Sequence, residues 1–201
     1  MVVKHGVDLE RFSEFAEHAA THRDEIQLEL SASATYEGRA GHSLTKVKAY
    51  SLGGEPIERA TREYTLPMGA WREVEAAAGF VGPTDRPEPI EVALATLTGC
   101  LNVAVSFTAL HEGIDIDGLE TSVRLDFDPS VVFFLDEVEN SETTFDDIDI
   151  TIEVSGDITD EQREVLQAGA RRSPVWNLMR LPNDMEPSVE VAKTGMPAAD
   201  D

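Results

Sequence analysis

The segment from Val92 to Leu110 contains no charged residue, and it constrains the fold more than any other part of the chain. Its length is close to the roughly 20 residues of a membrane-spanning helix. It also contains several polar residues, and Glu88 and Glu91 precede it in place of the basic residues that usually flank membrane spans. We therefore expect a central helix that begins at Pro89, ends at Gly113 and is buried by protein, not by a membrane.

Alternation of apolar and polar residues predicts strands on both sides of this helix. Before the helix, the candidate strands are residues 26–36, 44–52 and 57–66. After it come strands at 119–128 and 148–154, a helix that begins near Thr159, a short helix at 175–179 and a closing strand at Val189–Ala192. This order predicts an α+β fold with antiparallel strands around a long central helix.

The chain shows no internal repeat and no linker that would divide it. We expect one domain over residues 1–201, with a peripheral N-terminal helix within residues 1–22 and an acidic tail at residues 196–201. Asp8 is the candidate N-cap of the peripheral helix.

The formal net charge is −23, from 39 Asp and Glu against 16 Lys and Arg. Nucleic acids and anionic membrane surfaces would be repelled, so we expect neither as a partner. Such a charge destabilises a compact chain unless salt screens it, and at about 1 M salt the Debye length falls to roughly 3 Å. We expect a halophilic protein; an acidic mesophilic protein with a well-solvated surface is the alternative.

Cys100 is the only cysteine, so the chain has no internal disulfide. This favours a reducing compartment. The N-terminal residues lack the apolar core of a signal peptide, and we therefore expect a cytoplasmic protein.

Cys100 is either a small buried apolar residue or a nucleophile. A cysteine reacts as the thiolate, which a helix N-terminus, a cation or a metal must stabilise. Cys100 lies about three turns inside the predicted helix, beyond the effect of the helix end, and it therefore needs a cation. His111 is roughly 16 Å away along the helix. Arg39 is the first candidate, and the alternatives, all before the helix, are Arg62, Arg72 and His42.

No metal or cofactor site is expected. His18 and His22 are one helical turn apart, but no third ligand is spaced to complete a site, and a solvated helix face is the simpler interpretation. The chain also lacks the nucleophile-elbow, dinucleotide-binding and phosphate-loop motifs.

Three segments together resemble the OsmC/Ohr family, named for osmotically inducible protein C and organic hydroperoxide resistance. They are the run from Pro89 to Cys100, the segment Gly113–Ile116, and Ser173–Leu178 with its Pro-Val-x-Asn sequence. The resemblance covers roughly residues 28–195. It implies an intertwined homodimer whose sheets wrap two central helices, with a site at the subunit interface.

The peroxidases of this family attack a hydroperoxide with the helix cysteine and resolve the sulfenic acid with a second cysteine. Cys100 matches the first position, but Ser173 occupies the second, so no disulfide can form within one chain. The peroxidase branch also has a glutamate where this chain has Ile90. Glu91, one residue later, fits the less characterised OsmC-like branch.

The resemblance implies a one-cysteine peroxidase that reduces organic hydroperoxides and is itself reduced by an external thiol. Cys100 would attack the peroxide, Arg39 would hold the thiolate, and Glu91 would orient the arginine. The apolar pocket would include Ser173, Trp176 and Leu97. The alternative is a non-catalytic member of the family in which Cys100 is part of the core and the interface binds a small apolar ligand or nothing.

Overall fold

The computed structural model describes residues 2–57 and 64–191. Its helices are α1 (Leu9–Thr21), α2 (Arg72–Ala77), α3 (Pro89–Glu112), α4 (Asp160–Ala170) and α5 (Pro174–Arg180), with short 3₁₀ helices at Asp24–Ile26 and Val138–Thr143. Its strands are β1 (Val3–Lys4), β2 (Val7–Asp8), β3 (Leu28–Tyr36), β4 (Ser43–Leu52), β5 (Glu55–Ile57), β6 (Tyr64–Met68), β7 (Gly118–Phe127) and β8 (Phe145–Ser155). The predicted α+β class with antiparallel strands is confirmed.

The central helix α3 begins and ends where the sequence predicts. The Glu88 side chain accepts a hydrogen bond from the Ile90 N–H, and Glu91 accepts one from the Glu88 N–H, which together form a capping box. Gly113 ends the helix in a left-handed conformation with φ of 71°, which glycine adopts without strain. Both ends of α3 are therefore determined locally.

One side of α3 forms the core of the molecule. Leu97, Leu101 and Val105 lie on a single face of the helix and are 4%, 2% and 1% exposed. They pack with residues of α4 and with apolar side chains of β7 and β8. In the described part of the chain, α3 is the one helix that is long and apolar enough to cross a membrane. In this structure its face with Leu97, Leu101 and Val105 forms the core of an α+β fold.

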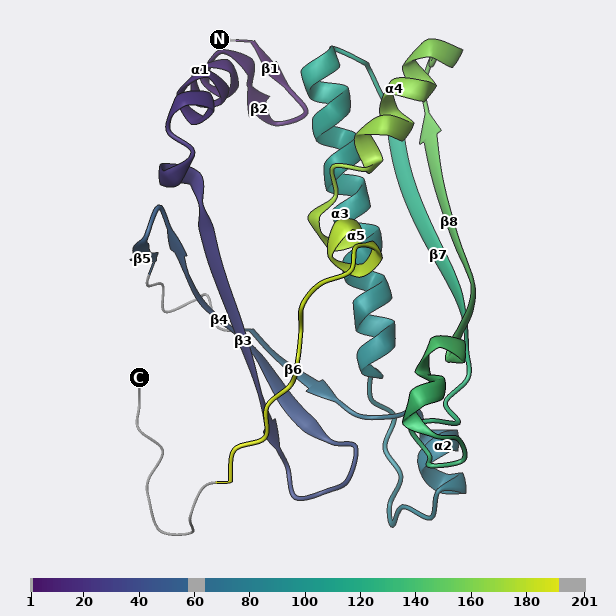
Figure 1. The fold of residues 1–201 in the computed structure, drawn as a ribbon. Coiled ribbons are helices and arrows are strands. Elements are labelled where there is room, and N and C mark those ends of the chain that lie inside the picture. Colours follow the sequence, from purple (N-terminus) through teal and green to yellow (C-terminus); the bar gives the residue numbers. More distant parts are fainter. Residues whose placement is uncertain (1, 58–63, 192–201) are drawn as a thin grey trace.

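The strands form two larger antiparallel sheets on either side of α3 in Figure 1, which also shows the N-terminal sheet standing away from α3. β3, β4, β5 and β6 make the N-terminal sheet, in which β5 and β6 both pair with β4. The predicted third strand, 57–66, therefore corresponds to two short strands beside β4, with residues 58–63 outside the described range. The second sheet pairs β7 with β8.

The predicted peripheral helix is α1, whose first turn Asp8 caps through the Glu10 N–H. A small hairpin of β1 and β2 precedes it, and Lys4 ties this hairpin to Asp115 at 2.8 Å. The predicted acidic tail, 196–201, lies outside the described residues.

The predicted closing strand at Val189–Ala192 is wrong for its described part. Residues 189–191 form no strand, and Val189 and Val191 are each 90% exposed. A strand requires a partner edge, and in the described chain nothing packs against these two valines.

Candidate functional site

Cys100 lies on α3 and is half-buried. It lines an open cavity of about 330 Å³ on the side of the helix away from the core. The other lining residues are Phe12, Val103, Ala104, Phe107, Thr108, His111, Glu112, Arg172 and Pro174. Cys100 is thus not sealed among aliphatic side chains, and this meets the first condition for a reactive thiol.

Arg172 reaches this cavity because α4 crosses α3 at very short range. A Cβ atom built on Gly169 of α4 would lie 2.3 Å from the Oγ1 atom of Thr108 on α3. After this glycine the chain makes a turn with two backbone hydrogen bonds. The Arg172 N–H donates to the Gly169 carbonyl at 2.9 Å, and the Ser173 N–H donates to the Ala170 carbonyl at 3.1 Å. The glycine at the crossing therefore determines where the segment that carries Arg172 lies on α3.

The three residues predicted to line the pocket lie outside this cavity in the single chain. Leu97 belongs to the core, and Ser173 is completely buried. The Ser173 hydroxyl accepts a hydrogen bond from the Trp176 N–H at 3.2 Å and caps α5. Trp176 is half-buried, and its ring faces the guanidinium of Arg180 at 4.3 Å. Their predicted contact with a substrate remains a prediction.

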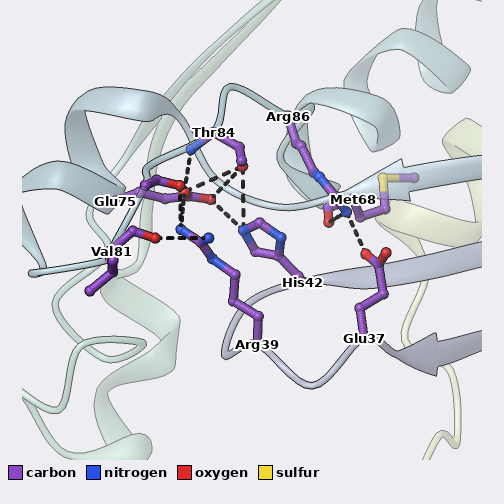
Figure 2. A network of polar contacts seen from close by, with 9 residues as sticks. Glu37, Arg39, His42, Met68, Glu75, Val81, Thr84 and Arg86 are labelled. Atoms are coloured by element: carbon purple, nitrogen blue, oxygen red, sulfur yellow. Dashed lines mark hydrogen bonds and ion pairs between the residues drawn. The ribbon is translucent and has the colours of Figure 1, made fainter.

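A second group of polar side chains surrounds Glu75, which lies on α2 and is only 1% exposed. Figure 2 shows the contacts: the Arg39 guanidinium donates to Glu75 at 3.1 Å, and His42 Nε2 lies 2.5 Å from the other carboxylate oxygen. The Thr84 N–H donates to the same carboxylate at 2.7 Å. This cluster joins the β3–β4 turn to α2 and to the loop before α3.

The environment of Glu75 keeps it ionised. Burial raises the pKa of this carboxyl, but hydrogen bonds from the Thr84 N–H, from His42 and from the Thr84 hydroxyl outweigh that effect and lower the pKa to about 2. A buried carboxylate with so many donors is a strong anchor for the residues around it.

Arg39, the predicted activating cation, belongs to this cluster. Besides Glu75, its guanidinium donates to the carbonyls of Val81 at 3.2 Å and Gly82 at 3.1 Å, and it lies 5.1 Å from the centre of the Phe80 ring. Its Nε atom is buried without a hydrogen-bond partner among the described residues. Within one chain, Arg39 does not line the Cys100 cavity.

Glu91, predicted to orient the arginine, contacts other groups in this chain. It accepts the Glu88 N–H at 2.9 Å in the capping box. Hydrogen bonds from Trp71 and from the Glu88 N–H lower the pKa of Glu91. The pairing of Glu91 with Arg39 is therefore not seen within one chain and remains a prediction.

The alternative cations are also placed away from Cys100. Arg72 is exposed at the start of α2, His42 pairs with Glu75, and Arg62 lies outside the described residues. His18 and His22 stack with their rings 4.2 Å apart, and His18 binds Glu25 at 2.8 Å. Across residues 2–57 and 64–191, no group of three or more His, Cys, Asp or Glu side chains is arranged to hold a metal.

Sequence reasoning missed two residues. Arg172 directly precedes Ser173, so its position beside a motif that matches the family was the available signal. Glu75 lies next to an alanine-rich run and is one of 39 acidic residues, and nothing in the local sequence distinguishes it.

These features define an α+β protein with a cysteine on a long central helix, open to a small and largely apolar cavity. Residues 82–188 match the family model described as OsmC-like protein, and the chain belongs to this family. The resemblance found in the sequence is therefore confirmed. The comparison with curated proteins found no match.

Two solved structures illustrate the shared fold. An OsmC-like protein from Mycoplasma pneumoniae is 12% identical, with a TM-score of 0.51 over 75% of this chain and 86% of that one. An organic hydroperoxide resistance protein from Elizabethkingia anophelis is 12% identical, with a TM-score of 0.50 over 76% and 88% of the two chains. At this level of identity the likeness concerns the fold alone.

Proposed function

We propose that the protein is a thiol-dependent peroxidase that reduces organic hydroperoxides with one cysteine. The observation that carries the proposal is the position of Cys100, which in a chain of the OsmC-like family lines an open cavity together with apolar side chains and an arginine. The apolar walls, which include Phe12, Val103 and Phe107, favour a peroxide with an organic substituent.

The chemistry requires no cofactor. The Cys100 thiolate attacks the terminal peroxide oxygen, so that an S–O bond forms while the O–O bond breaks. The alkoxide leaves and takes a proton from solvent to become an alcohol. Two electrons pass from sulfur to the peroxide, and the sulfenic acid returns to the thiol at the expense of two external thiols, which become a disulfide.

The test of this proposal is mass spectrometry of the protein in high salt, after one equivalent of cumene hydroperoxide and a sulfenic-acid trap. We expect rapid addition of a single oxygen at Cys100, reversal by added thiol, and no reaction in the Cys100→Ser variant. Because Cys100 is the only cysteine, every thiol signal reports on this site.

A folded wild-type protein in which Cys100 stays reduced would contradict the proposal. The alternative, a non-catalytic protein that binds a small apolar molecule, would then take its place. A second cavity of about 540 Å³, lined by aliphatic residues of α3, β8 and α4 together with Arg163 and Gln167, supports this alternative.

We also propose that the working protein is a homodimer. In the single chain, Leu28 and Leu30 on β3 are 54% and 69% exposed, and Val103 and Phe107 on α3 are 54% and 49% exposed. A second copy that packed against the N-terminal sheet and the open face of α3 would remove this apolar surface from water. Arg39, and Glu91 with it, would need such a second copy to act on Cys100.

Sedimentation in high salt tests the dimer. We expect a mass of twice the 22.0 kDa of one chain, and a shift towards the single-chain mass when Leu30→Glu places a charge on the apolar face of β3. Glu29→Gln, on the other face of the same strand, is the matched control and should leave the dimer intact. A wild-type protein that sediments as single chains at micromolar concentration would contradict the dimer.

The expected setting is a salt-rich cytoplasm, and composition supports it: the charge of −23 needs counterions, and the sole cysteine needs a reducing environment. For this reason the oxidation and sedimentation experiments use high salt.

A further inference from the structure

We infer that Arg172 is the catalytic cation of the Cys100 cavity, holding the thiolate and the leaving oxygen of the peroxide. This inference rests on the proposed peroxidase function and names a residue for it. It differs from the assignment of that role to Arg39, whose guanidinium is held by Glu75 and two backbone carbonyls away from the cavity.

The first step of the argument is position. Arg172 and Cys100 line the same cavity of about 330 Å³, although 72 positions separate them in sequence. The close crossing of Gly169 and Thr108 places the end of α4 against α3, and the cap of α5 by Ser173 holds the chain on the other side of Arg172. The backbone that carries Arg172 is therefore fixed at both ends, as a catalytic group requires.

The second step is charge. Five arginines in the described chain lie within ion-pair distance of a carboxylate: Arg11, Arg39, Arg86, Arg124 and Arg163. Arg172 forms no ion pair within the described residues, although the chain has 39 acidic side chains. Glu112, the one carboxylate that lines the cavity, lies 3.8 Å from His111. Arg172 thus retains its donors for an anion in the cavity.

The third step is chemistry. A guanidinium has five N–H donors in a fixed plane, so it can donate to the thiolate and, at the same time, to the peroxide oxygen that becomes an alkoxide. Both of these atoms carry negative charge in the transition state, when sulfur gives up two electrons and the O–O bond breaks. A cation beside them stabilises this state more than the resting peroxide.

Arg171 provides a matched control. It adjoins Arg172 at the end of α4, where either residue also has a favourable interaction with the negative end of the helix. Both arginines are exposed and carry the same charge, but Arg171 does not line the cavity. A purely structural or long-range electrostatic role predicts equal effects for Arg171→Gln and Arg172→Gln.

The experiment measures two rates on the full chain in high salt: oxidation of Cys100 by cumene hydroperoxide and its alkylation by iodoacetamide at pH 7. For Arg172→Gln we expect both rates to fall, the oxidation by about 100-fold and the alkylation by about tenfold. Arg171→Gln should stay within about twofold of wild type because Arg171 does not line the cavity and salt screens its charge over longer distances. Arg172→Lys should recover part of the alkylation rate but less of the oxidation rate, since lysine cannot donate to both atoms from one plane.

Rates for Arg172→Gln that equal those for Arg171→Gln would overturn the inference. A large loss of both rates in Arg39→Gln alone would assign the role to Arg39. Either result leaves the proposed peroxidase intact. Failure of the proposed function looks different: the wild-type protein would be alkylated at Cys100 yet not oxidised. The alkylation rates would then still decide whether Arg172 acts on the thiolate.

Discussion

Replacing Glu75 with alanine should lower the melting temperature of the protein by about 10 °C in high salt. The substitution leaves the buried His42 side chain and the Arg39 guanidinium without the carboxylate that accepts their hydrogen bonds. Glu73→Ala is the matched control, because Glu73 is exposed on the same helix, and its melting temperature should change by about 2 °C or less. Circular dichroism measures both, and equal shifts would show that the cluster adds no stability.

The same carboxylate predicts a pH dependence of stability. The pKa of Glu75 is about 2 in the folded protein, against an ordinary value of 4.5. A lowered pKa in the folded state stabilises the fold fully above the unfolded value, and this contribution is lost as the pH falls through the folded value. Between about pH 4.5 and 2, wild type should therefore lose more stability than Glu75→Ala. Denaturant titrations across this window test it, and parallel curves would contradict it.

Gly169→Ala should lower the free energy of unfolding by about 2–3 kcal/mol. The sign is informative, because the same change in an open helix interior stabilises a protein by about 1 kcal/mol. Here the new methyl group would lie 2.3 Å from Thr108 Oγ1 and 2.6 Å from both its Cβ and Cγ2 atoms. The two helices would have to separate, and the segment that carries Arg172 would move with α4.

A double-mutant cycle with Thr108→Ala isolates this contact. Thr108→Ala removes the Oγ1 and Cγ2 atoms, so Gly169→Ala should cost about half as much in that background. Denaturant unfolding in high salt measures all four proteins. An equal cost with and without the threonine would mean that the crossing is not as close as the structure has it.

The parts of the fold that could be predicted are those that nearby residues determine. The limits of α3 follow from Pro89, the Glu88–Glu91 capping box and Gly113, all of which are legible in sequence. Strands β3 and β7 alternate in a period of two and were placed within two residues of their ends. The prediction of a closing strand at Val189 was wrong because alternation of apolar residues alone does not provide a neighbouring strand to pair with.

Only those residues of the candidate site that neighbouring sequence identifies could be predicted. Cys100 could be found because it is unique and lies in a motif that resembles a family. The partners of Glu75 come from positions 33, 36 and 9 residues away, and Arg172 meets Cys100 only because α4 crosses α3 at Gly169. Such contacts depend on tertiary packing, and a single sequence contains no periodic signal for them.

Ser173 caps α5 where a two-cysteine relative would hold its resolving thiol, and a hydroxyl cannot form the disulfide through which an oxidised sulfur is reduced. The lifetime of a sulfenic acid at Cys100 would then depend on the arrival of another thiol from solution. Peroxide that arrived first would convert it to sulfinic acid, which ordinary thiols do not reduce. Such a protein would suit a slow, continuous supply of hydroperoxide and would inactivate itself in a sudden excess.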